Sequence, residues 1–118
     1  MGYSQEAYVA YGVYIPLDPY AQDEAGLLTT EQVDQALSVP TVKIECPEVG
    51  HLSAGDLDRD KFFLVTQCDS AELGQYIRLI PNVDTEDWNH QLAHLIDTMG
   101  WSGLDLEPPS WFVVSDFS

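Results

Sequence analysis

One stretch near the beginning of the chain sets the expected fold: Ala7-Tyr8-Val9-Ala10-Tyr11-Gly12-Val13-Tyr14-Ile15-Pro16-Leu17. Its β-branched and aromatic residues favour an extended backbone, and Pro16 ends the run. We therefore expect a strand here, at the centre of a sheet.

Four further segments are expected to be strands, namely residues 41–46, 61–67, 75–80 and 111–114. The first alternates apolar and polar residues, which is the period of a half-buried strand. The second is centred on Phe62-Phe63-Leu64-Val65, and Pro81 ends the third. The last follows a pair of prolines.

Two helices are expected, at residues 30–37 and between Asp84 and Gly100, and residues 18–26 between the first strand and the first helix form a loop. Thr29 and Gln32 have the spacing of a capping box at the start of the first helix. Asp84 suits the N-cap of the second, and Gly100 supplies its stop. The apolar residues of this second helix recur at helical spacing and predict its core face: Trp88, Leu92, Leu95, Ile96 and Met99.

These segments follow in the order β-α-β-β-β-α-β. That order predicts a single α+β domain over residues 1–118, with a mainly antiparallel sheet of four to five strands and two helices on one face. A length of 118 residues is enough for one hydrophobic core and too short for two.

The chain is strongly acidic, with 20 Asp plus Glu against 4 Lys plus Arg and a formal net charge of −16. Ten acids and two bases fall in each half of the chain, so the acidity belongs to the folded surface. So few cations exclude direct nucleic-acid binding and attraction to an anionic membrane. The sequence lacks a basic segment followed by an apolar one at its start, and it has no long apolar run. We therefore expect a cytoplasmic protein.

Asp56, Asp58 and Asp60 have the spacing that opens a calcium-binding loop. Such a loop needs glycine at its sixth position and glutamate at its twelfth, where this chain has Lys61 and Gln67. We interpret the segment as a solvated acidic turn, or as a row of carboxylates that meets a basic partner.

Two histidines, His90 and His94, are four residues apart and share one face of the second predicted helix. That face points away from the apolar one, and no third metal ligand can be named, so we expect no metal and no cofactor.

The other residues that carry chemistry form no catalytic pattern. Ser53 stands beside a histidine without the flanking glycines of a nucleophile elbow, and the glycines form no phosphate-binding loop. We expect no catalytic residue and no enzymatic activity. Cys46 and Cys68 are read as free, buried thiols, with a disulfide or a reactive role as alternatives.

Aromatic residues beside carboxylates are typical of an interface for a partner rich in Arg and Lys. The expected partner-binding residues are Asp56, Asp58, Asp60, Glu86, Asp87, Asp97, Tyr11 and Trp101.

The segments Tyr8-Val9-Ala10-Tyr11-Gly12-Val13-Tyr14-Ile15 and Trp111-Phe112-Val113-Val114-Ser115 resemble the two ends of small hypothetical proteins encoded by actinobacterial phages. That family has no assigned activity, so the resemblance implies no catalytic residue. It implies a phage setting, in which small acidic proteins often block host enzymes that handle nucleic acid.

These observations favour a non-catalytic protein that binds a basic, nucleic-acid-handling surface of a host or phage protein, as a DNA-mimicking inhibitor or anti-defence factor does. One alternative is an immunity protein or antitoxin that neutralises a basic toxin. Another is an accessory phage protein whose acidity serves only solubility.

Overall fold

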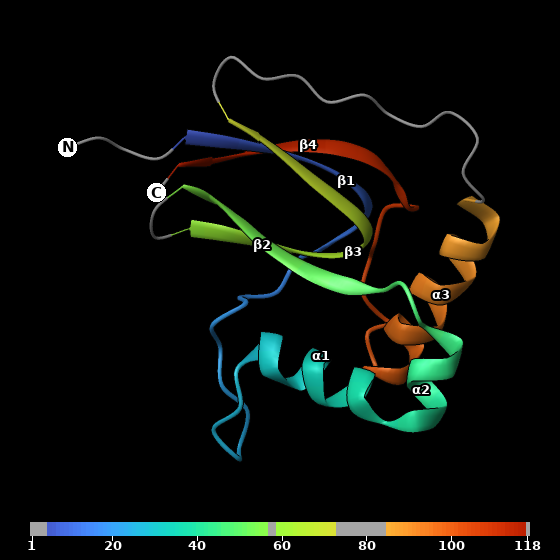
Figure 1. Ribbon diagram of the computed structural model, residues 1–118. Coiled ribbons are helices and arrows are strands. Elements are labelled where there is room, and N and C mark those ends of the chain that lie inside the picture. Colours follow the sequence, from blue (N-terminus) through green and yellow to red (C-terminus); the bar gives the residue numbers. More distant parts are fainter. Residues whose placement is uncertain (1–4, 57–58, 73–84, 118) are drawn as a thin grey trace.

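The computed structural model describes residues 5–56, 59–72 and 85–117. Its elements are β1 (Gln5–Ile15), α1 (Thr29–Ser38), α2 (Pro40–Glu45), β2 (Gly50–Asp56), β3 (Arg59–Glu72), α3 (Thr85–Thr98) and β4 (Ser110–Phe117). Figure 1 shows the strands gathered in one part of the molecule, with the helices below them and to their right. The predicted α+β class is confirmed, with a four-stranded sheet and three helices.

The strand β1 is central, as predicted, because both of its edges are paired. It is antiparallel to β3 on one side and to β4 on the other, and β2 is antiparallel to β3. The four strands therefore follow the order β1-β3-β2-β4. One parallel pair, Asp56 with Phe117, joins β2 to β4 and closes the sheet into a ring.

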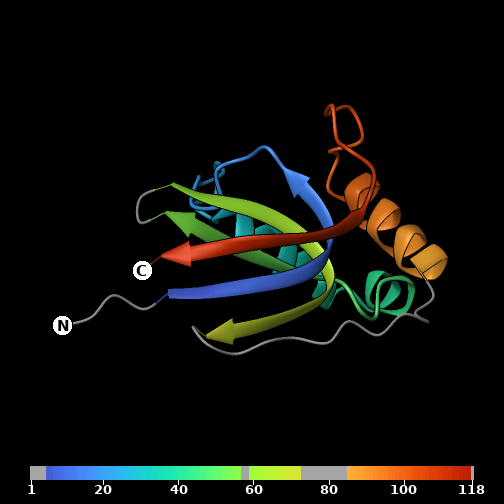
Figure 2. The same cartoon turned by 90° about the horizontal axis from the view of Figure 1, so that it is seen from above.

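The sheet closes with so few strands because β3 is long and bends sharply, as Figures 1 and 2 show. The bend coincides with a shift in register opposite β1, where Tyr11 pairs with Gln67 but Gly12 pairs with Val65. Thr66 is thus an extra residue on β3. Such a bulge bends its strand and increases the local twist.

The main core lies between one face of the sheet and all three helices. Val13 and Ile15 of β1 and Phe62 and Leu64 of β3 point to this side. The helices contribute Val33, Val42, Trp88, Leu92 and Leu95. The predicted apolar face of α3 is confirmed, because its remaining members, Ile96 and Met99, pack against the same core.

A second, smaller cluster occupies the opposite face of the sheet. Ala10, Phe63 and Val65 are buried there, and Leu52, Phe112 and Val114 pack against them. Alternate residues of β3 therefore serve two separate clusters, which explains the uninterrupted apolar run from Phe62 to Val65.

The strand predicted over residues 41–46 is wrong, because residues 40–45 form the helix α2. Pro40 occupies its first turn, where the missing N–H costs nothing. In a strand Val42, Ile44 and Cys46 would share a face. In the structure Val42 and Cys46 are buried at helical spacing, whereas Ile44 is 75% exposed.

The predicted start of α1 and the predicted end of α3 can be compared with the structure. The N-cap of α1 is Leu28, so the predicted capping box is wrong. The Thr29 hydroxyl instead donates to the Asp18 carbonyl at 2.9 Å and fastens the preceding loop. Gly100 does stop α3, with a φ of 77° and with N–H bonds from Gly100 to Asp97 and from Trp101 to Ile96.

One strand, β2, was not expected from the sequence, which predicted no strand between residues 47 and 60. Two other predictions, the strand over residues 75–80 and the N-cap role of Asp84, lie outside the described residues. The final strand is confirmed and is longer than predicted.

Candidate interaction surface

The helices and the segments next to them carry nine exposed carboxylates. We call residues 29–48 and 85–107 the helical layer. It holds nine carboxylates and one lysine, Lys43, all of them exposed. The carboxylates are Glu31, Asp34, Glu45, Glu48, Glu86, Asp87, Asp97, Asp105 and Glu107.

Three of these carboxylates, Glu86, Asp87 and Asp97, lie on α3 and were predicted from the sequence. All three are exposed because the opposite face of the helix carries the core residues Leu92 and Leu95. Packing of that core face fixes the rotation of the helix. The carboxylates are therefore held on a rigid element and turned to solvent.

The predicted row at the β2–β3 connection does not join this surface. Asp58 and the side chain of Asp56 lie outside the described residues. Asp60 is partly exposed and accepts a hydrogen bond from the Tyr20 hydroxyl at 2.5 Å. The end of β2 and the start of β3 are at the left of the molecule in Figures 1 and 2, whereas α3 is at the right. Asp60 near the start of β3 and the carboxylates of α3 thus lie at opposite ends of the molecule.

The two aromatic residues predicted to contact a partner both pack against the main core. Tyr11 is only 5% exposed, packs between Trp88 and Trp111, and donates a hydrogen bond to Asn89 Oδ1 at 2.7 Å. Trp101 is half-buried, with its ring edge-on to Phe62. These rings stabilise the contact between sheet and helices, so Tyr11 cannot meet a partner.

The carboxylates of the helical layer make several contacts with other described residues. Among pairs of described residues, only His51 Nε2 and Asp34 Oδ1 come within ion-pair distance, at 3.0 Å. Glu48 accepts a hydrogen bond from Trp88 Nε1 at 2.6 Å, and Asp87 accepts one from Gln91 Nε2 at 2.9 Å. Both donors are neutral, and their hydrogen bonds orient the two carboxylates.

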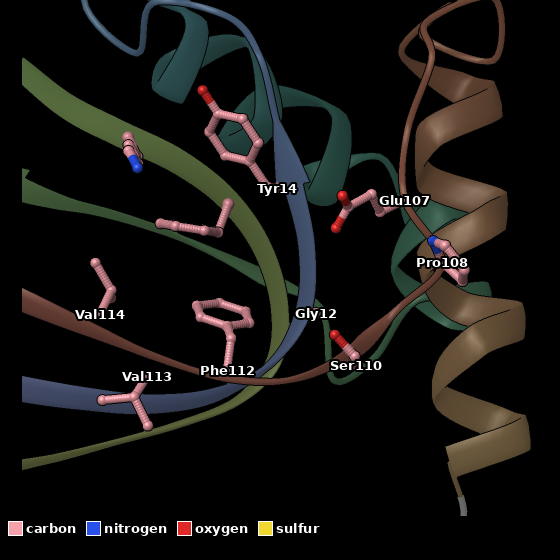
Figure 3. Close-up of a pocket in the computed structure, with 10 residues that line it drawn as sticks. Gly12, Tyr14, Glu107, Pro108, Ser110, Phe112, Val113 and Val114 are labelled. Atoms are coloured by element: carbon pink, nitrogen blue, oxygen red, sulfur yellow. The ribbon is translucent and has the colours of Figure 1, made fainter.

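A hollow of about 300 Å³ opens on the face of the sheet that the helices leave uncovered. Figure 3 shows Phe112 and Val114 directed into it and Val113 directed away. Tyr14, Phe63 and Phe112 form a row of rings, with centroids 5.5 Å apart for the first pair and 4.5 Å for the second. Sequence reasoning missed this hollow, because it depends on the bend of the sheet.

The described residues show no arrangement for metal chemistry. They include no group of three His, Cys, Asp or Glu side chains that could hold an ion. His90 and His94 are exposed on α3, on the side away from the core.

Both cysteines are free, but only Cys46 is buried, which corrects the prediction for Cys68. Burial, and secondarily the charge of Glu45, raises the pKa of the Cys46 thiol. Burial of part of the side chain, together with Asp69, does the same for the pKa of Cys68. Both thiols thus hold their protons more firmly than a free cysteine does, which is the opposite of a reactive thiolate.

The chain matches no model of a known protein family, no curated protein and no solved structure. Within the described residues, none of the helices has the length and apolar character needed to cross a membrane.

Proposed function

We propose that the protein is a non-catalytic binding protein whose helical layer occupies a basic, nucleic-acid-handling surface of another protein. The observation that carries this proposal is the ratio of nine exposed carboxylates to one lysine on that layer. The partner is a basic host or phage protein, and the activity is inhibition of a DNA-mimic or anti-defence type. The phage setting comes from the resemblance of the two terminal strands.

The physical case depends on rigidity as well as charge. A nucleic acid presents phosphates at fixed spacings, and its partner proteins gain affinity when counterions are released. Carboxylates on a folded helix lose little conformational freedom on binding, because the helix is already held by its core face. The three carboxylates of α3 satisfy that requirement. Exposed carboxylates also steer a basic partner toward the surface.

The experiment begins with the immobilised protein, which is used to isolate a partner from a host extract. Affinity for that purified partner is then measured for the double variant Glu86→Lys with Asp97→Lys. Each reversal removes an attraction and adds a repulsion, so we expect the affinity to fall by at least about tenfold. Affinity of the unmodified protein should also fall steeply with added salt, and duplex DNA should compete.

A matched control separates the helical layer from net charge. Glu24→Lys with Asp69→Lys changes the net charge by the same amount at two other exposed positions. A third variant reverses Asp56, Asp58 and Asp60 and tests the opposite end of the molecule. We expect both to bind nearly as well as the unmodified protein. Equal losses in all three variants, or indifference to salt and DNA, would contradict the proposal and favour a solubilising role.

A further inference from the structure

The hollow on the uncovered face of the sheet combines aromatic walls with a carboxylate at its rim. Tyr14, Phe63 and Phe112 supply the rings, and Glu107 and Ser110 line the side nearest α3. Tyr14 is 46% exposed although it adjoins the buried Phe63, so part of its ring is open to a ligand. A volume of about 300 Å³ is at the lower end for small-molecule sites and is sufficient for one side chain.

The strand β1 contributes two residues to the hollow, Gly12 and Tyr14. Gly12 contributes no side chain. Tyr14 lies two positions further along the same strand and therefore points to the same side of the sheet. Ser110 is the register partner of Gly12 on β4, so these two residues line the hollow side by side.

The charge around the hollow favours a cation as its occupant. The chain as a whole carries a formal net charge of −16, which disfavours a carboxylate or phosphate anywhere on it. Glu107 is exposed and provides an anion at the rim. A guanidinium is planar, stacks on aromatic faces and pairs with carboxylates through two parallel hydrogen bonds, whereas an ammonium does neither as well.

Lys61 also borders the hollow and is exposed. Its four-carbon stem can cover apolar surface while the ammonium stays in water. That ammonium repels a bound guanidinium and would attract a bound anion. The sign of the effect of Lys61 on affinity therefore distinguishes the two kinds of occupant.

We propose that this hollow is the acceptor site for a single arginine side chain of the basic partner, stacked on Tyr14 and paired with Glu107. The inference rests on the proposed function for the source of the arginine. It adds a shaped contact on the uncovered face of the sheet, next to Glu107 of the helical layer. Buried arginine anchors of this kind carry much of the energy of protein interfaces.

The test uses a small probe, so that it does not require the partner. N-acetyl-L-arginine methylamide is titrated into the protein and followed by NMR on the ring protons of Tyr14 and Phe112. The citrulline analogue has the same shape without the charge and serves as the control ligand. We expect the arginine probe to shift these protons saturably in the millimolar range, and the citrulline probe to shift them much less.

Substitutions give effects of opposite sign at the two charged residues. Glu107→Gln should weaken binding of the arginine probe by about fivefold, and Lys61→Met should strengthen it. Tyr14→Ala should abolish the shift at Phe112. Tyr20→Ala is the matched control, because Tyr20 is another exposed tyrosine, at 56%, and does not line the hollow.

Absence of saturable shifts, or weaker binding after Lys61→Met, would overturn the arginine site. The isolated partner then separates this inference from the proposed function. If Tyr14→Ala leaves partner affinity unchanged while Glu86→Lys with Asp97→Lys reduces it, the hollow does not bind an arginine of the partner. The proposal that the helical layer binds the partner is then supported. If the arginine probe binds but Glu86→Lys with Asp97→Lys leaves partner affinity unchanged, the hollow is supported as an arginine site. The helical layer is then not the interface with the partner.

Discussion

Gly12 of β1 lies so close to Leu64 of β3 that a Cβ atom on Gly12 would be 2.0 Å from the Leu64 carbonyl oxygen. It would also be 2.8 Å from Val65 Cα. These are backbone atoms in a paired strand, so they cannot rotate away as a side chain can. The close approach of the two strands at the bend therefore requires a residue without a side chain.

Replacing Gly12 with alanine should lower the free energy of unfolding by about 3 kcal/mol or more, because a backbone clash must be relieved by moving β1 and β3 apart. Urea unfolding followed by tryptophan fluorescence measures the loss. Gly103→Ala is the matched control, since a Cβ there meets nothing within 4 Å, and it should change stability by less than about 0.5 kcal/mol. Equal stability of the two variants would mean that the strands separate at no cost.

Gln91 is 3% exposed, and its side chain joins α3 to the segment after α2. Its Oε1 accepts from the Glu48 backbone N–H at 2.9 Å, and its Nε2 donates to Asp87. Gln91→Met keeps the shape and removes both bonds, so we expect a loss of about 1–2 kcal/mol in the same unfolding assay. Gln35→Met, at an exposed position of α1, should be nearly neutral. An unchanged free energy of unfolding in Gln91→Met would show that these hydrogen bonds make no net contribution to stability.

Like charges on the helical layer repel, and salt screens them over about 8 Å at physiological ionic strength. The melting temperature should therefore rise between low salt and roughly half-molar NaCl. Differential scanning calorimetry at several salt concentrations measures it. A flat or falling curve would contradict the view that this charge is uncompensated.

The raised pKa values of the two thiols have a consequence for stability at high pH. As pH rises, the unfolded chain releases its thiol protons before the folded chain does. The unfolded state is therefore stabilised relative to the folded state. Their contribution is complete below the pKa of an unfolded cysteine, about 8.5, and declines above it. Chemical unfolding at neutral pH and at about pH 10 should show a smaller alkaline loss for Cys46→Ala than for the unmodified protein. An identical loss would exclude this thiol as a cause.

Exchange of both α3 histidines for glutamine should leave the fold and any partner affinity nearly unchanged. His90 and His94 are exposed, and no third ligand accompanies them among the described residues. Circular dichroism and the partner affinity check this expectation. Stoichiometric zinc in protein purified without added metal, lost in the double variant, would contradict it.

The sequence correctly predicts those elements whose side-chain pattern fits only one type of secondary structure. The apolar spacing of α3 and the dense β-branched run of β1 are of this kind. It fails where two periods fit the same residues, as at Val42 and Cys46, which suit a strand as well as one helical turn. It also misses β2, since His51-Leu52-Ser53-Ala54-Gly55 has few strand-forming residues and extends because β3 offers it an edge to pair with.

The candidate surface was predictable in part for the same reason. The exposed carboxylates of α3 follow from its helical period. Tyr11 was misplaced, because neighbouring tyrosines on a strand point to opposite faces and the sequence does not say which face the helices cover. The hollow beside Tyr14 requires the bend at Gly12, which depends on a contact between residues more than fifty positions apart.

The pairing of β1 with β4 also bears on how the protein is made. Gln5 pairs with Phe117, so one edge of β1 has no native neighbour until the ribosome has produced residues more than a hundred positions later. Until then a strongly apolar strand has an open edge, and open edges are sites of aggregation. The dense negative charge of the nascent chain repels other copies during this interval. The acidity would thus protect the chain during synthesis, and completion of the sheet would be a slow, late step.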